Sequence, residues 1–138
     1  MKSRLIYWLT YAGMWLLALW PFKALYALSD GLCFLMHHVV HYRRRVVRTN
    51  LRHAFPEKSE TELRDIERGF YRYICDYMLE EVKMLRMSFK ELCRRMEYDN
   101  KEEYLAMIEK HGGIVLLIPH YANFEWITGM SSIMQEGD

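Results

Sequence analysis

The chain has 138 residues, a length that suits a single domain. It is 51% hydrophobic and 14% aromatic, an unusually apolar composition for a soluble protein, and its net charge is only +1. Its 3 cysteines are odd in number and lack metal-like spacing, which argues against a disulfide framework and against a cysteine-based zinc site. We therefore interpret them as reduced residues of a domain that faces the cytosol.

Residues 1–42 are predicted to be a membrane-anchoring helical segment. Residues 5–22 form an uncharged run that is just long enough for a transmembrane helix, and a second apolar segment covers residues 24–42. Two arrangements are open: the first segment spans the membrane and the second lies in the interface, or both enter it as a hairpin. In either case the positive-inside rule places the following part of the chain in the cytoplasm.

A basic cluster comes next, with helical spacing. Its members are Arg43, Arg44, Arg45, Arg48 and Arg52. Beside an apolar segment, such a cluster predicts an anchor on anionic headgroups, worth about 1 kcal/mol per residue near the surface. A sharper hypothesis is that one or two members of the group Arg44, Arg45 and Arg48 bind phosphates of a lipid substrate, which suits the guanidinium fork. We expect no nucleic acid partner, because the cluster is short and no base-stacking motif follows.

No metal or cofactor site is expected. His37 and His41 would share a helix face, but no carboxylate or cysteine adjoins them to complete a zinc ligand set. The chain also lacks a glycine-rich nucleotide loop.

The middle of the chain predicts helices. Ser59-Glu-Thr-Glu62 has capping-box spacing and precedes an amphipathic helix over residues 61–86. Its expected inward face consists of Leu63, Ile66, Phe70, Tyr73 or Ile74, Tyr77, Glu81 or Val82, and Leu85. A second capping box at Ser88-Phe-Lys-Glu91 begins a short helix, and residues 96–99 are predicted as a short strand. A third helix begins at Asn100 and ends at Gly112-Gly113.

The apolar run at residues 114–118 is predicted to be a buried, parallel strand. It lies between Gly112-Gly113 and Pro119, and short continuous apolar runs with such boundaries are typical of parallel sheets. In sheets with helical connections, chemistry gathers at the carboxyl ends of the strands, and His120 lies just beyond this end. Residues 124–134 then predict a helix.

His120 and Glu125 are the candidate catalytic residues. A neutral histidine can accept a proton from a hydroxyl near pH 7, and a carboxylate on its other ring nitrogen fixes the tautomer and stabilises the imidazolium. Five residues on a regular helix correspond to about 140° of rotation, so the pair needs a bent junction, which Pro119 and Asn123 favour. No serine or cysteine adjoins the pair, so we infer a base that activates the hydroxyl of a substrate. The plainer alternative is a surface histidine with a hydrogen-bonding role.

This motif resembles one of a known family. His120-Tyr-Ala-Asn-Phe-Glu125, after Ile-Val-Leu-Leu-Ile-Pro, is similar to the His-x4-Asp/Glu motif of glycerolipid-type acyltransferases. More narrowly, it resembles the bacterial lipid A biosynthesis (late) acyltransferases. The apolar amino terminus agrees, as does Arg44-Arg-Val-Val-Arg-Thr-Asn-Leu51 leading to Ala54-Phe-Pro-Glu-Lys-Ser59. That family often reads His-Tyr-Gly-Asn-Trp-Glu here, so Ala122 and Phe124 are mild departures that keep the two chemical residues.

The resemblance implies an α/β fold, in which a membrane helix or hairpin leads into helices and the start of a mainly parallel sheet. It implies acyl transfer from a fatty acid on acyl carrier protein to a hydroxyl of a membrane glycolipid, a lipid A precursor, without a cofactor. The location would be the bacterial cytoplasmic (inner) membrane, with the catalytic part facing the cytoplasm. Residues 43–138 would be the amino-terminal part of the catalytic domain, because members of the family continue well beyond this point.

In this interpretation His120 deprotonates the acceptor hydroxyl, and Glu125 orients His120 and stabilises its charge. Asn123 shapes the turn or donates to the oxyanion. Two alternatives stay open. One is an acyltransferase that acts on another lipid acceptor, such as an aminolipid or a lysophospholipid. The other is a truncated, membrane-anchored remnant without catalytic activity.

Overall fold

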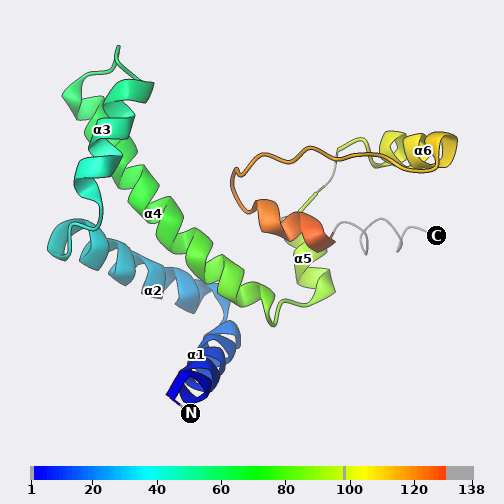
Figure 1. Cartoon of the computed structure of the whole chain (residues 1–138), viewed down its shortest axis with the longest axis horizontal. Helices are drawn as coiled ribbons and strands as arrows, with labels where there is room; N and C mark the ends of the chain where they lie inside the picture. The colour runs from blue at the N-terminus through cyan, green and yellow to red at the C-terminus, as the bar shows by residue number, and fades with distance from the viewer. Residues whose placement is uncertain (1, 98, 130–138) are drawn as a thin grey trace. The chain divides into compact units, whose positions relative to one another are not determined.

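The computed structural model describes residues 2–97 and 99–129 (Figure 1). Its elements are α1 (Lys2–Ala18), α2 (Phe22–Phe34), a π-helical segment η1 (Leu35–Val39), α3 (Arg44–Ala54), α4 (Glu60–Met84), α5 (Phe89–Arg95), α6 (Lys101–His111) and a 3-10 helix η2 (Phe124–Gly129). The chain divides into two compact units between Lys83 and Met84. The first unit holds α1 to α4, and the second holds α5, α6 and η2.

The predicted α/β fold is wrong, because residues 2–97 and 99–129 contain no strand and no sheet. The apolar run at residues 114–118 is irregular chain, and Val115 and Leu117 in it are 88% and 89% exposed. A strand exists only through hydrogen bonds to a neighbouring strand, and the described residues offer no such neighbour. Residues 96, 97 and 99 of the other predicted strand are also irregular or in a turn, and residue 98 lies outside the described residues.

The predicted transmembrane helix is wrong as well. α1 ends at Ala18. Pro21 follows, and α2 begins at the next residue, Phe22. At 17 residues, α1 is shorter than the roughly 20 that the hydrocarbon core of a bilayer requires. Among the described residues, no helix combines the length and the apolar character needed to cross a membrane.

Three helix ends lie where the sequence predicts them. At the start of α4, the Ser59 hydroxyl accepts from the Glu62 backbone N–H at 3.3 Å, and the Glu62 carboxylate accepts from the Ser59 N–H at 2.9 Å. At the start of α5, the Ser88 hydroxyl accepts from the Glu91 N–H at 3.2 Å. Gly112 ends α6 with φ +73°, a left-handed conformation that costs glycine little. Local sequence therefore determines these ends.

The long helix α4 buries one narrow stripe of side chains. Its members are four positions apart: Leu63, Glu67, Tyr71, Cys75 and Leu79. The predicted inward face is therefore only partly right, since Phe70 and Tyr73 are 40% and 43% exposed. A hydrophobic pattern assigns Glu67 to the surface, yet only 1% of this residue is exposed.

Partners from two other elements make the burial of Glu67 possible. Nε of Arg44 and Nε of Arg48, both on α3, donate to its two carboxylate oxygens at 2.8 and 2.7 Å. Nε2 of His37, on η1, lies 3.2 Å from the oxygen that Arg44 contacts. Burial alone would raise the pKa of Glu67, but the hydrogen bonds from Arg48 and Arg44 outweigh it, and the pKa is lowered. We call these four residues the Glu67 clamp.

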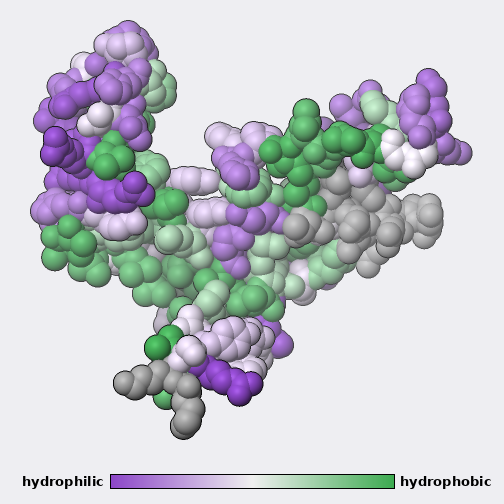
Figure 2. Space-filling model, viewed as in Figure 1, coloured by the Kyte–Doolittle hydropathy of each residue, from purple (hydrophilic) through white to green (hydrophobic). Residues whose placement is uncertain are grey.

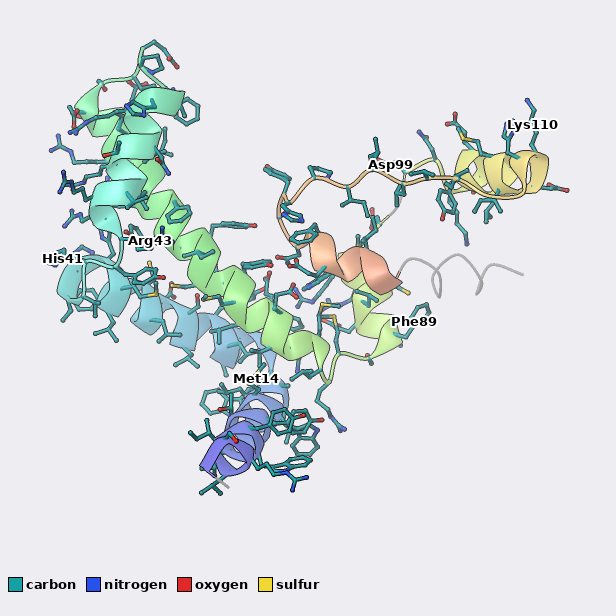
Figure 3. All side chains as sticks on the ribbon, in the orientation of Figure 1. Met14, His41, Arg43, Phe89, Asp99 and Lys110 are labelled. Carbon is teal, nitrogen blue, oxygen red and sulfur yellow. The ribbon has the colours of Figure 1, made fainter. Side chains whose placement is uncertain are left out.

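Figure 2 shows hydrophilic side chains gathered over α3, the helix that supplies both arginines of the clamp. The turn from η1 into α3 is strained, because His41 and Arg43 have φ of 52° and 50° (Figure 3). A left-handed conformation costs a non-glycine residue about 1–2 kcal/mol. The Tyr71 hydroxyl of α4 donates to the Tyr42 carbonyl between them, so contacts with α4 help to hold this turn.

Polar contacts also join the amino-terminal helices to α4. Lys83 Nζ donates to the backbone carbonyls of Ala18 and Trp20, both at 2.8 Å, and these carbonyls belong to the end of α1 and the turn after it. The Tyr26 hydroxyl of α2 donates to Glu80 at 2.6 Å. The last carbonyl groups of a helix lack intrahelical partners, so Lys83 satisfies groups that α1 cannot satisfy itself.

We expect Glu67→Gln to lower the free energy of unfolding by about 2–4 kcal/mol, measured by urea denaturation. Loss of one partner of a buried ion pair costs about 3–5 kcal/mol. The loss is smaller here because the Arg44 and Arg48 side chains are 30% and 40% exposed and regain some hydration. The control is Glu60→Gln, which removes the exposed pair with Arg52 and should leave stability almost unchanged. Equal losses in both variants would contradict a structural role for the clamp.

Candidate functional site

His120 lies at a sharp bend in the second unit. The Tyr121 N–H donates to the Pro119 carbonyl at 2.8 Å and closes a tight turn around His120. Ala122 then has φ 52°, in the left-handed region. The bend that the sequence predicts between Pro119 and Asn123 is therefore present, although it follows irregular chain instead of a strand.

The segment that carries Glu125 is held by its neighbours. The Trp126 N–H donates to the Asn123 carbonyl at 3.0 Å at the start of η2, and Trp126 is 5% exposed. η2 lies against α5, where Gly129 approaches Leu92 so closely that a Cβ on it would lie 2.3 Å from Leu92 Cδ2. The predicted helix over residues 124–134 is a 3-10 helix as far as residue 129, and the rest lies outside the described residues.

The two candidate catalytic residues have different surroundings. His120 is exposed, and its ring stacks on that of Phe124 with the centroids 4.3 Å apart and an interplanar angle of 27°. Glu125 is half-buried in η2. No hydrogen bond joins the His120 ring to the Glu125 carboxylate in the described part of the chain. The bend brings the two residues into one short segment, and Asn123 contributes its backbone carbonyl to the beginning of η2.

The arginines predicted to bind substrate phosphates lie in the first unit. Arg44 and Arg48 use Nε to bind Glu67, yet both side chains stay partly exposed. Arg45 is exposed on the same helix. The sequence did not predict the contact between Glu67 and His37, although one signal was available: Glu67 falls in a row with Leu63 and Tyr71 at steps of four.

His37 is the buried residue of η1. His37 binds the Glu67 carboxylate, and burial lowers the pKa of His37, which favours the neutral ring. Within residues 2–97 and 99–129, no three His, Cys, Asp or Glu side chains gather in a way that would hold a metal ion.

The sequence model of the bacterial lipid A biosynthesis acyltransferases matches residues 1–136. The chain belongs to this family. It is also 27% identical over 122 residues to the lipid A biosynthesis lauroyltransferase of Escherichia coli (strain K12), an alignment that covers 86% of this chain. The chain spans 40% of the length of that relative. No solved structure matches the chain significantly.

We expect Ala122→Gly to raise the free energy of unfolding by about 0.5–1 kcal/mol. The left-handed φ costs alanine about 1–2 kcal/mol, and the greater chain entropy of glycine offsets part of that relief. Urea denaturation measures the change. The control Ala106→Gly lies inside α6 and should destabilise by about 0.5–1 kcal/mol. Similar losses in both variants would contradict the left-handed conformation of Ala122.

Proposed function

We propose that this protein transfers a fatty acyl chain from acyl carrier protein to a hydroxyl of a membrane glycolipid, a lipid A precursor. The observation that carries the proposal is the motif from His120 to Glu125 in a chain that matches the family over residues 1–136. The name of the Escherichia coli relative, a lauroyltransferase of lipid A biosynthesis, supports the same chemistry.

His120 acts as the general base. Its exposed imidazole takes the proton of the acceptor hydroxyl, and the resulting oxygen nucleophile attacks the thioester carbonyl. The tetrahedral intermediate collapses with cleavage of the C–S bond, and the imidazolium returns its proton to the thiolate that leaves. The products are an ester and a free thiol, and no acyl-enzyme forms because no serine or cysteine adjoins His120.

Glu125 is a positioning residue. A carboxylate at the second ring nitrogen selects the tautomer of the base and stabilises the imidazolium. Catalytic hydrogen bonds are often long before substrate binds, and closure of the bend would bring Glu125 to the imidazole. Asn123 shapes this bend through the carbonyl that begins η2, with donation to the oxyanion as its alternative role.

On α3, one or two members of the group Arg44, Arg45 and Arg48 bind phosphate groups of the acceptor or of nearby lipids. The partial exposure of Arg44 and Arg48 supports this role, because a guanidinium that uses Nε for Glu67 keeps further N–H donors. The clamp also fixes the directions of these two side chains, so less entropy is lost when an anion binds.

We place the protein at the cytoplasmic face of the bacterial inner membrane, with α1 lying in the interface. α1 exposes large apolar side chains along its length, including Trp8 at 61% and Leu9 at 64%. Tryptophan and tyrosine favour the boundary between lipid and water, and Tyr7 and Tyr11 lie beside Trp8. A helix that lies in the interface can be shorter than a helix that crosses the bilayer.

The proposal is tested by mass spectrometry of lipid A from source cells with and without the gene. We expect deletion to remove one acyl chain, and the parent gene to restore it. His120→Ala should lower transfer by at least about a hundredfold, the scale of general base catalysis. Glu125→Gln should have a smaller effect, since it keeps the base and weakens its orientation.

Other results would point elsewhere. Unchanged lipid A with an altered aminolipid or lysophospholipid would keep the chemistry and change the acceptor. Full restoration of lipid A by His120→Ala would refute the assignment of the base. If the purified chain transfers no acyl group and no lipid changes on deletion, the chain is a non-catalytic member of the family.

We expect the double variant Trp8→Ser, Leu9→Ser to weaken binding to phosphatidylcholine vesicles by about tenfold or more. Each side chain would lose part of the roughly 1.5–3 kcal/mol that burial of a large apolar group contributes. Vesicle flotation measures the bound fraction. The control is Val115→Ser, Leu117→Ser, which removes two apolar groups of the second unit that are even more exposed, at 88% and 89%. A larger loss in the control would contradict anchoring by α1.

A further inference from the structure

Three arginines lie beside the Glu67 clamp and have no part in the proposed chemistry. Arg64, Arg68 and Arg72 are four residues apart on α4, so they share one face of the helix. Each follows a member of the buried stripe by one position, which is about 100° around the helix axis. All three are exposed. We call them the arginine row.

Two neighbouring cavities lie along the arginine row. The first, of about 260 Å³, is lined by Arg64 and Arg68, and the second, of about 480 Å³, is lined by Arg68 and Arg72. His37 and His38 of η1 line both cavities. The row therefore faces a hollow between α4 and η1 and not a flat surface.

Positive charge exceeds negative charge in the lining of these cavities. The carboxylates in the lining are Glu67 and Asp65, and both already bind arginine: Glu67 within the clamp, and Asp65 through Arg68. Arg64 and Arg72 form no ion pair or hydrogen bond with another described residue. Guanidinium groups at the edge of a cavity, without protein acceptors, suit a phosphate, which accepts paired N–H donors.

The clamp also fixes the opposite wall of the cavities. Nδ1 of His37 lies 3.2 Å from Nε2 of His38, while Nε2 of His37 contacts the Glu67 carboxylate. The ring of His38 stacks on Phe34 with the centroids 5.0 Å apart. These contacts hold an exposed imidazole against the arginine row, where it adds another group able to bind an anion.

Gly69 lines the second cavity. Glycine inside a helix costs about 0.5–1 kcal/mol relative to alanine. A Cβ at Gly69 would meet no atom within 4 Å, so packing does not require glycine there. Its missing side chain leaves room beside Arg68 and Arg72.

We propose that the arginine row and His38 bind the phosphate of an anionic lipid headgroup. This rests on the proposed function for the class of molecule bound, and it adds a phosphate site on α4 to the contacts proposed for α3. Each guanidinium supplies N–H donors, and the cavities give an anion a place where it can contact neighbouring members of the row.

The test compares binding of the full chain to phosphatidylcholine vesicles with and without phosphatidic acid, by vesicle flotation at low salt. The parent should prefer the vesicles that contain phosphatidic acid. Arg64→Gln, Arg68→Gln, Arg72→Gln together should reduce that preference at least about tenfold, since each cation near a membrane contributes about fivefold. Gly69→Leu, which places a bulky side chain in the lining of the second cavity and leaves the charge unchanged, should also reduce it. The matched control Lys58→Gln, Lys90→Gln, Lys110→Gln should retain most of it.

Two results would overturn the site. Equal losses in the arginine and lysine variants, with Gly69→Leu behaving as the parent, would show general attraction between charges. Binding of inorganic phosphate by the parent, with no preference for phosphatidic acid, would show a site for free phosphate and not for a lipid. This experiment measures binding to vesicles, and the His120→Ala experiment measures acyl transfer. A failure of one proposal can therefore be distinguished from a failure of the other.

Discussion

Burial of the Glu67 carboxylate determines how the helices of the first unit pack. A buried charge is costly unless partners surround it, and here two arginines of α3 and a histidine of η1 do so. The clamp thereby sets the rotation of α4. One side of α4 presents the arginine row to the cavities beside η1, and another presents Phe70, Ile74 and Met78 to a cavity of about 340 Å³ against α3.

The proposed acyl transfer to a lipid needs a base, cations that bind the headgroup and contact with the membrane, and the groups proposed for these roles lie on separate elements. The proposed base, His120, lies at a bend that is followed by the buried Trp126 and by the close approach of Gly129 to α5. The proposed phosphate-binding cations lie on α3 and α4, and the clamp orients Arg44 and Arg48 among them. The apolar surface is that of α1. Preorganisation of each group before substrate binds lowers the entropy lost on binding.

Local signals in the sequence predicted much of the secondary structure and little of the packing. Capping residues at Ser59 and Ser88 and the glycine at 112 predicted helix ends correctly, because the atoms involved lie within three or four residues. The strand predicted at residues 114–118 was wrong. An apolar run between glycine and proline favours an extended conformation, but a strand also requires a neighbouring strand for its hydrogen bonds. The length of α1 was overestimated because the uncharged run continues beyond Ala18, where the helix ends.

By itself the sequence determined the helix ends at Ser59, Ser88 and Gly112, the bend around His120, and membership of the lipid A acyltransferase family, whose model matches residues 1–136. Only the tertiary structure decided that Glu67 is buried and that Arg64 and Arg72 do not form ion pairs with it. The physical reason is the range of the interaction. The partners of Glu67 lie 19, 23 and 30 positions away, so no periodic pattern within α4 reveals that a charge belongs inside.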